Sequence, residues 1–172
     1  MVLKNYYEFL KHLCSYPTQQ APSTSLVKDL NNNNLAGIYY PTGGGTSYIN
    51  PALSSRTPKS TLGILIGTGD TPPTYDDYTL ENRVTLTSVS TNISYDVVTE
   101  NNVVKFRTLL TKTVNNNTQD TVTIKEIGVH KGIYTTNNTT YQDILISREI
   151  LSEPIVIEPN GEATFVFYFD EQ

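Results

Sequence analysis

The sequence predicts an all-β protein, an antiparallel β-sandwich of the jelly-roll or immunoglobulin-like kind. Composition is the first reason: of 172 residues only 17% are charged and 12 are tyrosines, and Thr and Asn are abundant. Thr and Tyr favour strands, whereas Asn favours turns. The second reason is that, from residue 60 onward, short alternating apolar segments recur at the spacing of a sandwich. We therefore expect a β-sandwich domain at residues 59–172, preceded at residues 1–58 by a helix and an extended arm.

The N-terminal segment has the spacing of a short amphipathic helix. Its apolar positions recur every three or four residues, with Lys and Glu between them; they are Leu3, Tyr6, Tyr7, Leu10 and Leu13. A helix this short is marginal in isolation, so its apolar stripe must rest on another surface. That surface is either the chain's own β domain or a neighbouring subunit.

The arm that follows is rich in Thr, Ser, Asn, Gly and Pro, a composition typical of irregular structure. Residues 26–30 could add one further turn of helix. The arm is nevertheless too apolar for a simple linker, so we expect it to fold onto a larger surface. Its large apolar residues include Tyr39, Tyr40, Tyr48 and Ile49.

Eight strands are expected in the β domain. In the first, Leu62, Ile64 and Ile66 share one face before glycines and prolines end the strand. The expected strands cover residues 60–67, 82–89, 92–99, 103–114, 120–130, 143–151, 154–158 and 161–169. Four of their side chains are expected in the core: Phe106, Ile124, Ile127 and Phe167.

The fifth expected strand changes the parity of its apolar positions. Val122 and Ile124 share one face, whereas Ile127 and Val129 share the other. A shift of one residue reverses the face to which side chains point. A β-bulge near residues 125–126 would keep both pairs in the core, and we predict one there.

The last expected strand is apolar on both faces. Phe165, Phe167 and Phe169 alternate with Val166 and Tyr168. Such a strand is usually central in its sheet, or a partner covers its second face.

No catalytic signature is present in the sequence, so we do not expect an enzyme. His12, His130 and the single Cys14 are too few to build a metal site of histidines and cysteines, or a nucleophile with its base. Residues 67–69 lack the Gly-Lys-Ser/Thr ending of a phosphate-binding loop. No cofactor and no metal are therefore predicted.

The loop after the first strand is acidic, because it contains Asp70, Asp76, Asp77 and Glu81. Oxygen-rich loops can bind Ca²⁺, but Asp side chains also accept hydrogen bonds from turn amides, and we favour turns. Four Asn-x-Ser/Thr sequences are likewise interpreted as turn chemistry rather than glycosylation sites, since no signal peptide is recognised. They begin at Asn92, Asn116, Asn137 and Asn138.

Charge and hydropathy exclude two classes of partner. The net charge of −5 and the pI near 4.9 argue against nucleic acid, which requires a concentrated basic surface. The N-terminus lacks a continuous apolar run, so neither a signal peptide nor a membrane span is expected. Loop tyrosines instead favour a protein interface, or else a sugar. The expected interface residues are Leu3, Tyr6, Tyr7, Leu10, Leu13, Tyr39, Tyr40, Tyr48, Tyr75 and Tyr78.

Three segments resemble the β-rich virion structural proteins of tailed bacteriophages, a capsid-associated or tail-associated class. They are residues 64–80, with the sequence ILIGTGDTPP followed by DYTL, residues 124–129 and residues 145–157. With the terminal strand, the resemblance covers residues 57–172.

This resemblance implies a non-enzymatic virion protein that docks on neighbouring subunits in a symmetric assembly, in the capsid, neck or tail. Its partners would be other virion proteins and copies of itself, after assembly in the cytoplasm of a bacterial host. The alternative is a β-sandwich module at the particle surface that binds a host glycan or receptor.

Overall fold

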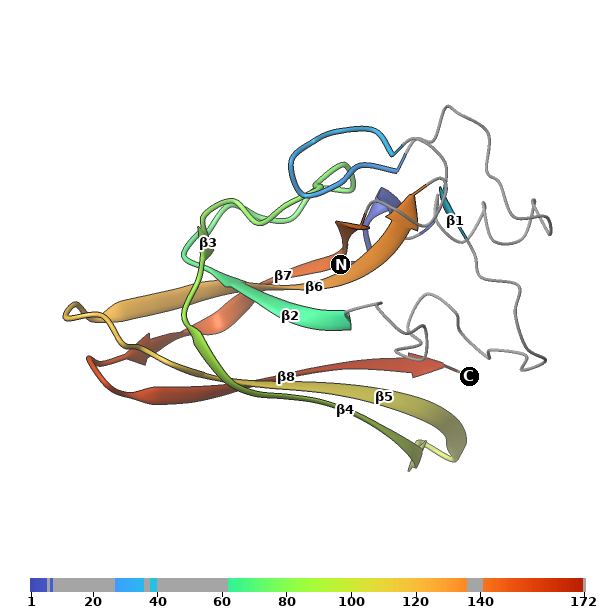
Figure 1. Ribbon diagram of the computed structural model, residues 1–172. Coiled ribbons are helices and arrows are strands. Elements are labelled where there is room, and N and C mark those ends of the chain that lie inside the picture. The colour runs from blue at the N-terminus through green and yellow to red at the C-terminus, as the bar shows by residue number, and fades with distance from the viewer. Residues whose placement is uncertain (6, 8–26, 36–37, 40–61, 136–140, 172) are drawn as a thin grey trace.

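The computed structural model describes residues 1–5, 7, 27–35, 38–39, 62–135 and 141–171. Two antiparallel sheets lie one over the other (Figure 1). Their strands are β1 (Ile38–Tyr39), β2 (Leu62–Gly67), β3 (Arg83–Val84), β4 (Thr87–Glu100), β5 (Val103–Asn115), β6 (Val122–Thr135), β7 (Tyr141–Ile157) and β8 (Glu162–Glu171). The prediction of an all-β protein with antiparallel sheets is confirmed.

The first sheet is built around β6. β7 pairs with one side of β6, while β2 and β1 pair with the other side, and β3 pairs with β2. The second sheet has the order β4-β5-β8. In two places the structure has one long strand where two consecutive strands were expected. Residues 87–100 form one strand with a bulge between Ser88 and Ser90, and residues 141–157 form another.

Pro154 lies inside β7 without breaking it. The pairing with β6 passes from Ile155 to Ile150, so the proline sits in an unpaired stretch where its missing N–H costs no ladder bond. The sequence analysis expected two strands here, at residues 143–151 and 154–158, and the structure joins them.

The main core lies between the sheets. It joins Ile64 of β2 and Ile124 of β6 to Leu110 of β5 and Phe165 of β8. A smaller cluster on the outer face of the first sheet contains Leu3, Leu65, Leu80 and Leu145. Both faces of β2 are therefore covered, which is why all six of its residues are buried.

The irregularity predicted in β6 near residues 125–126 is present, but its extra residues lie in β7, which passes from Ile155 to Ile150 while β6 passes from Ile124 to Glu126. The register with β7 shifts between Ile124 and Glu126, and Ile124, Ile127 and Val129 are all buried. The same shift turns Glu126 to the outer face, where it becomes the centre of a polar cluster described below.

One expectation for the second sheet is wrong. Phe106 is 57% exposed, although it shares a face with the buried Leu110, because the described part of the first sheet does not cover this end of the β4–β5 hairpin. Among the described strands β8 pairs with β5 alone, so it does not lie between two of them, and the alternative expected for it, a partner over its second face, stays a prediction. Its parity is as expected: Phe165 is buried, Phe167 packs partly buried against the core, and Tyr168 is exposed.

Two of the crossovers between the sheets, from β5 to β6 and from β7 to β8, meet at Asn116, which is fully buried. Its side-chain amide donates to the carbonyls of Asp120 and Ile157 at 2.8 and 2.9 Å, and its oxygen accepts from the amide and hydroxyl of Thr118. Asn116 is therefore a turn residue, as the sequence indicated.

The arm residues that are described lie on the first sheet. Val2 bridges to Ser147, and the Leu3 amide donates to the Ile146 carbonyl, so residues 1–3 extend the sheet beyond β7. Leu3 is thus extended rather than helical; Lys4, Asn5 and Tyr7 are helical, and residues 8–14 lie outside the described residues.

Residues 27–35 form a loop, so the further helical turn suggested for this region is wrong. A bridge between Lys28 and Asn34 closes the loop. The carboxylate of Asp29 accepts from the amides of Asn31 and Asn33 at 2.9 and 2.8 Å, which favours the turn over a helix.

Candidate interaction surface

Residues 68–82 connect β2 to β3 and cross the outer face of the first sheet (Figure 1). The anchor of this loop is Glu126, whose side chain is fully buried. Its carboxylate accepts hydrogen bonds from the backbone amides of Gly69, Glu81 and Asn82, at 3.2, 3.2 and 2.9 Å. A buried carboxylate is costly unless it is paired and hydrogen-bonded, so both ends of the loop are held to one point of β6.

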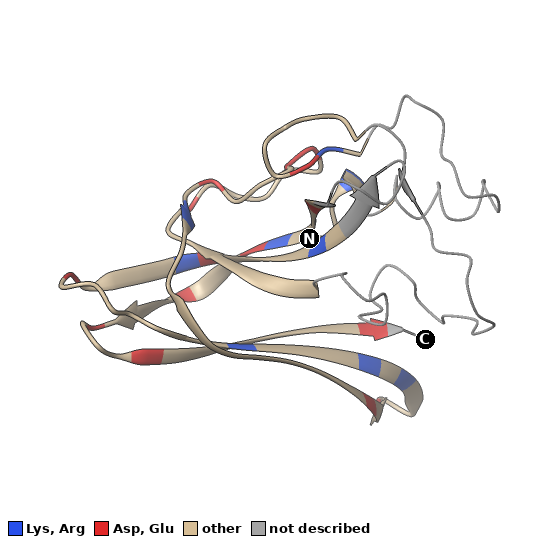
Figure 2. Ribbon diagram, in the orientation of Figure 1, with Lys and Arg blue, Asp and Glu red and all other residues tan. Residues whose placement is uncertain are grey.

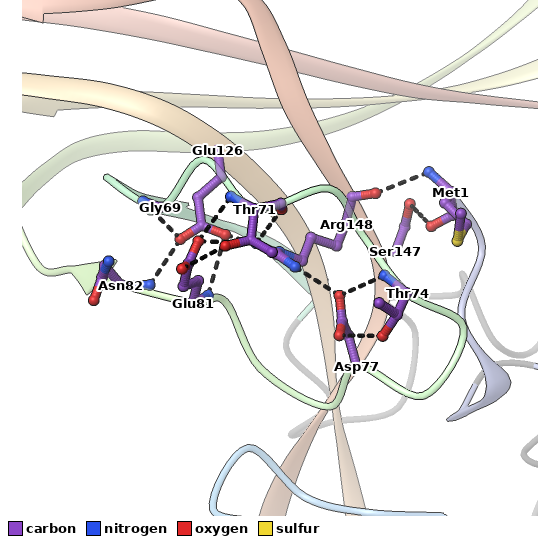
Figure 3. Close-up of polar contacts among 10 residues, drawn as sticks. All are labelled: Met1, Gly69, Thr71, Thr74, Asp77, Glu81, Asn82, Glu126, Ser147 and Arg148. Atoms are coloured by element: carbon purple, nitrogen blue, oxygen red, sulfur yellow. Dashed lines mark hydrogen bonds and ion pairs between the residues drawn. The ribbon is translucent and has the colours of Figure 1, made fainter.

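Arg148 of β7 supplies the matching positive charge and is only 4% exposed (Figure 3). Its Nε lies 2.8 Å from Glu126, its Nη1 lies 2.6 Å from Asp77, and its Nη2 donates to the carbonyl of Thr71. Burial alone would lower the pKa of Arg148, but the hydrogen bonds to Asp77 and Glu126 outweigh burial and raise the pKa.

Asp77 fixes the middle of the loop. Its carboxylate accepts from the amide and hydroxyl of Thr74 and from Arg148. Burial acts to raise the pKa of Asp77, but the Thr74 hydrogen bonds and the guanidinium prevail and hold the pKa below its ordinary value.

The other acidic residues of the loop are also engaged. Asp70 pairs with Lys125 at 2.9 Å, Asp76 pairs with Lys4 at 3.1 Å, and Glu81 accepts two hydrogen bonds from Thr71. Within the residues that the structure describes, no group of three or more His, Cys, Asp or Glu side chains converges as metal ligands would. Asp77 and Glu81 therefore accept hydrogen bonds from residues of the loop itself, whereas Asp70 and Asp76 form ion pairs with lysines outside it.

This framework presents aromatic rings to solvent. Tyr75 and Tyr7 are each about half exposed, and their ring centroids lie 6.3 Å apart. The Lys4 amide donates to the Tyr75 carbonyl, which ties the N-terminal segment to the loop. Lys28 lies over the ring of the nearby Tyr78, at 5.4 Å from its centroid. We call Tyr7, Tyr75 and Tyr78 the tyrosine surface.

The structure places two of the expected interface residues, Tyr7 and Tyr75, in contact, and Tyr78 lies in the same loop as Tyr75. Leu3 lies in the interior, against Leu65 and Leu80. Tyr39 lies in β1, where it pairs with Tyr134 of β6. The remaining expected residues lie outside the described part of the chain: Tyr6, Leu10, Leu13, Tyr40 and Tyr48.

Sequence reasoning missed Glu126 and Arg148 as the base of this surface. The signal that could have found them is the parity change in β6, because a bulge placing two apolar pairs in the core must turn a charged residue toward the opposite face.

No protein-family model, curated protein or solved structure matches the chain. Among the described residues, no helix has the length and hydrophobicity needed to span a bilayer.

Proposed function

We propose that the chain is a non-enzymatic structural protein of a tailed-bacteriophage virion, and that it docks on neighbouring subunits through the tyrosine surface. The observation that supports docking is the exposed contact between Tyr7 of the N-terminal segment and Tyr75, which lies on a loop fixed by a buried ion pair. Tyrosine offers large contact area at low entropic cost, and a loop that is already ordered loses little further entropy on binding. The phage assignment rests on the sequence resemblance.

In this proposal the domain is a sandwich of the jelly-roll or immunoglobulin-like kind with a short amphipathic helix at its N-terminus. The protein is located in the virion, and its partners are other virion proteins and copies of itself. A modest contact suffices, because repetition around a symmetric assembly multiplies weak interfaces into strong attachment.

The test compares the wild type with a Tyr7→Ala, Tyr75→Ala double variant in purified particles. An antibody against the chain, with mass spectrometry of the particles, should find the wild type in stoichiometric amounts and the double variant at least about tenfold depleted. The matched control is Tyr168→Ala, which removes an equally exposed tyrosine from the other sheet and should incorporate normally.

Absence of the wild-type chain from particles contradicts the proposal. The glycan alternative makes a different prediction: the double variant would incorporate normally but lose binding to a glycan array.

A further inference from the structure

β4 is a long edge strand with few of the features that prevent an edge strand from pairing with a strand of another molecule. It has 14 residues, nearly all exposed, and among the described strands it pairs with β5 alone. Natural edge strands are usually blunted by lysine, proline or short length. β4 contains no Lys, Arg, Pro or Gly, and charges are sparse along it (Figure 2). Its bulge lies at the far N-terminal end, between Ser88 and Ser90.

The hairpin turn defines which backbone groups of β4 are unused. Glu100 pairs with Val103 across a two-residue turn, in which Asn101 and Asn102 have φ of 53° and 62°. These are the values of a type I′ turn, which is flanked by a hydrogen-bonded pair. Because the pattern alternates, the odd-numbered residues 91–99 direct N–H and C=O toward the free edge.

A side-chain contact supports this assignment. The amide of Val97 donates to the carboxylate of its neighbour Asp96 at 2.8 Å, a bond that satisfies an amide pointing away from β5. The Asp96 carboxylate thus occupies one of the backbone N–H groups that point toward the free edge of β4.

The same residues carry an apolar surface. Side chains of Tyr95 and Val97 are 64% and 58% exposed, and they lie beside Phe106 and Val104 of β5, each 57% exposed. On the reverse side of the hairpin, Glu100 is already paired with Lys105 and Arg107, at 3.1 and 2.7 Å. This end of the sheet therefore combines unused backbone groups with an exposed apolar face.

We propose that β4 pairs antiparallel with β4 of a second copy of this chain, about a two-fold axis at Tyr95, so that two three-stranded sheets become one of six strands. In this register Tyr95 faces Tyr95 of the second copy and Ile93 faces Val97 of the second copy. Opposed apolar and aromatic pairs are favourable. The five pairs of odd-numbered residues exchange about ten hydrogen bonds, the number found in an ordinary protein interface.

The charges on β4 favour a second copy of the chain as the partner, and they favour the register with the two-fold axis at Tyr95. Asp96 faces the neutral Ser94 of the second copy, whereas an axis one residue further would oppose two Asp96 carboxylates, and like charges directly opposed destabilise a sheet. A self-pair needs no cation from the partner, since Glu100 is neutralised within its own copy.

The first test is sedimentation velocity of the full chain from micromolar to millimolar concentration. Wild type should pass from monomer to dimer. Val97→Pro removes an edge N–H that β5 does not use, so the variant should stay folded and be at least about tenfold weaker in dimerisation. Tyr95→Lys places two like charges on the axis and should have the same effect, which covers the case in which the proline variant does not fold. Asp96→Ala uncaps the Val97 amide and should strengthen the dimer.

A cysteine test fixes the register. In a Cys14→Ser background, Tyr95→Cys should form an intermolecular disulfide on mild oxidation, because residues in a hydrogen-bonded pair have Cα atoms about 5.5 Å apart. Val97→Cys should not, since its symmetry mate would lie four residues away, about 13 Å. A monomeric wild type, a dimer unaffected by Tyr95→Lys, or equal cross-linking of the two cysteine variants overturns the proposal. The tyrosine surface lies on the other sheet, so these results do not depend on the virion assignment.

Discussion

Replacing Arg148 with Met should destabilise the protein by about 3–5 kcal/mol, because it leaves the carboxylate of Glu126 buried without a counter-charge. The two side chains are 4% and 0% exposed and lie 2.8 Å apart, so solvent screens their interaction little. Methionine fills most of the volume of the arginine stem, which limits any cavity. The loss therefore reports mainly the charge.

Urea unfolding monitored by circular dichroism measures the difference in unfolding free energy. In a chain of 172 residues the same loss corresponds to a fall in Tm of roughly 6–20 °C, at about 2–4 °C per kcal/mol. The control is Lys125→Met. Lys125 neighbours Glu126 in sequence, but its partner Asp70 is 71% exposed, and removal of this pair should change stability by less than about 1 kcal/mol.

A loss below about 1 kcal/mol for Arg148→Met would refute the reasoning, because it would mean that the buried carboxylate of Glu126 does not need the charge of Arg148. The Glu126→Gln variant provides a second test, in which the rate of proteolysis of the loop is measured. It keeps an oxygen for the loop amides but leaves Arg148 without that partner, and proteolysis should then cleave the loop at residues 68–82 faster than in the wild type.

Four further outcomes are expected. Burial lowers the pKa of Lys131 to about 8, so between about pH 8 and 10 the unfolded chain binds more protons than the folded chain. Stability should therefore rise with pH across that window, and Lys131→Met should abolish the rise in Tm. Asn116→Ala should cost about 1–3 kcal/mol in urea unfolding by orphaning buried carbonyls, whereas the exposed Asn92→Ala should be neutral. Phe165→Ala should cost about 3–5 kcal/mol, against less than about 1 for Phe106→Ala; equal costs would mean that the exposed end of the hairpin is covered. A chelator should leave Tm unchanged, and a fall reversed by Ca²⁺ would contradict the turn interpretation of the acidic loop.

Local patterns in the sequence were sufficient to predict strands, the change of parity in β6 and the inward face of β8, because alternation and parity are properties of neighbouring residues. The exposure of Phe106 was not predictable in this way. The alternation of residues in β5 predicts the face on which the Phe106 side chain lies. Whether that side chain is buried depends on how far the first sheet extends over it. The link between Glu126 and Arg148 also escaped the sequence, since the pairing of β6 with β7 is what aligns them.

The contacts that hold the tyrosine surface have a consequence for biosynthesis. Asp77 and Lys4 are made early, but the loop is closed by Arg148, which lies 71 residues after Asp77. A nascent chain emerging from the ribosome therefore displays no ordered tyrosine surface until β7 has been translated and has reached β6. Fragments that stop before Arg148 lack the side chain that closes the loop, so unfinished chains cannot present the surface in its ordered form.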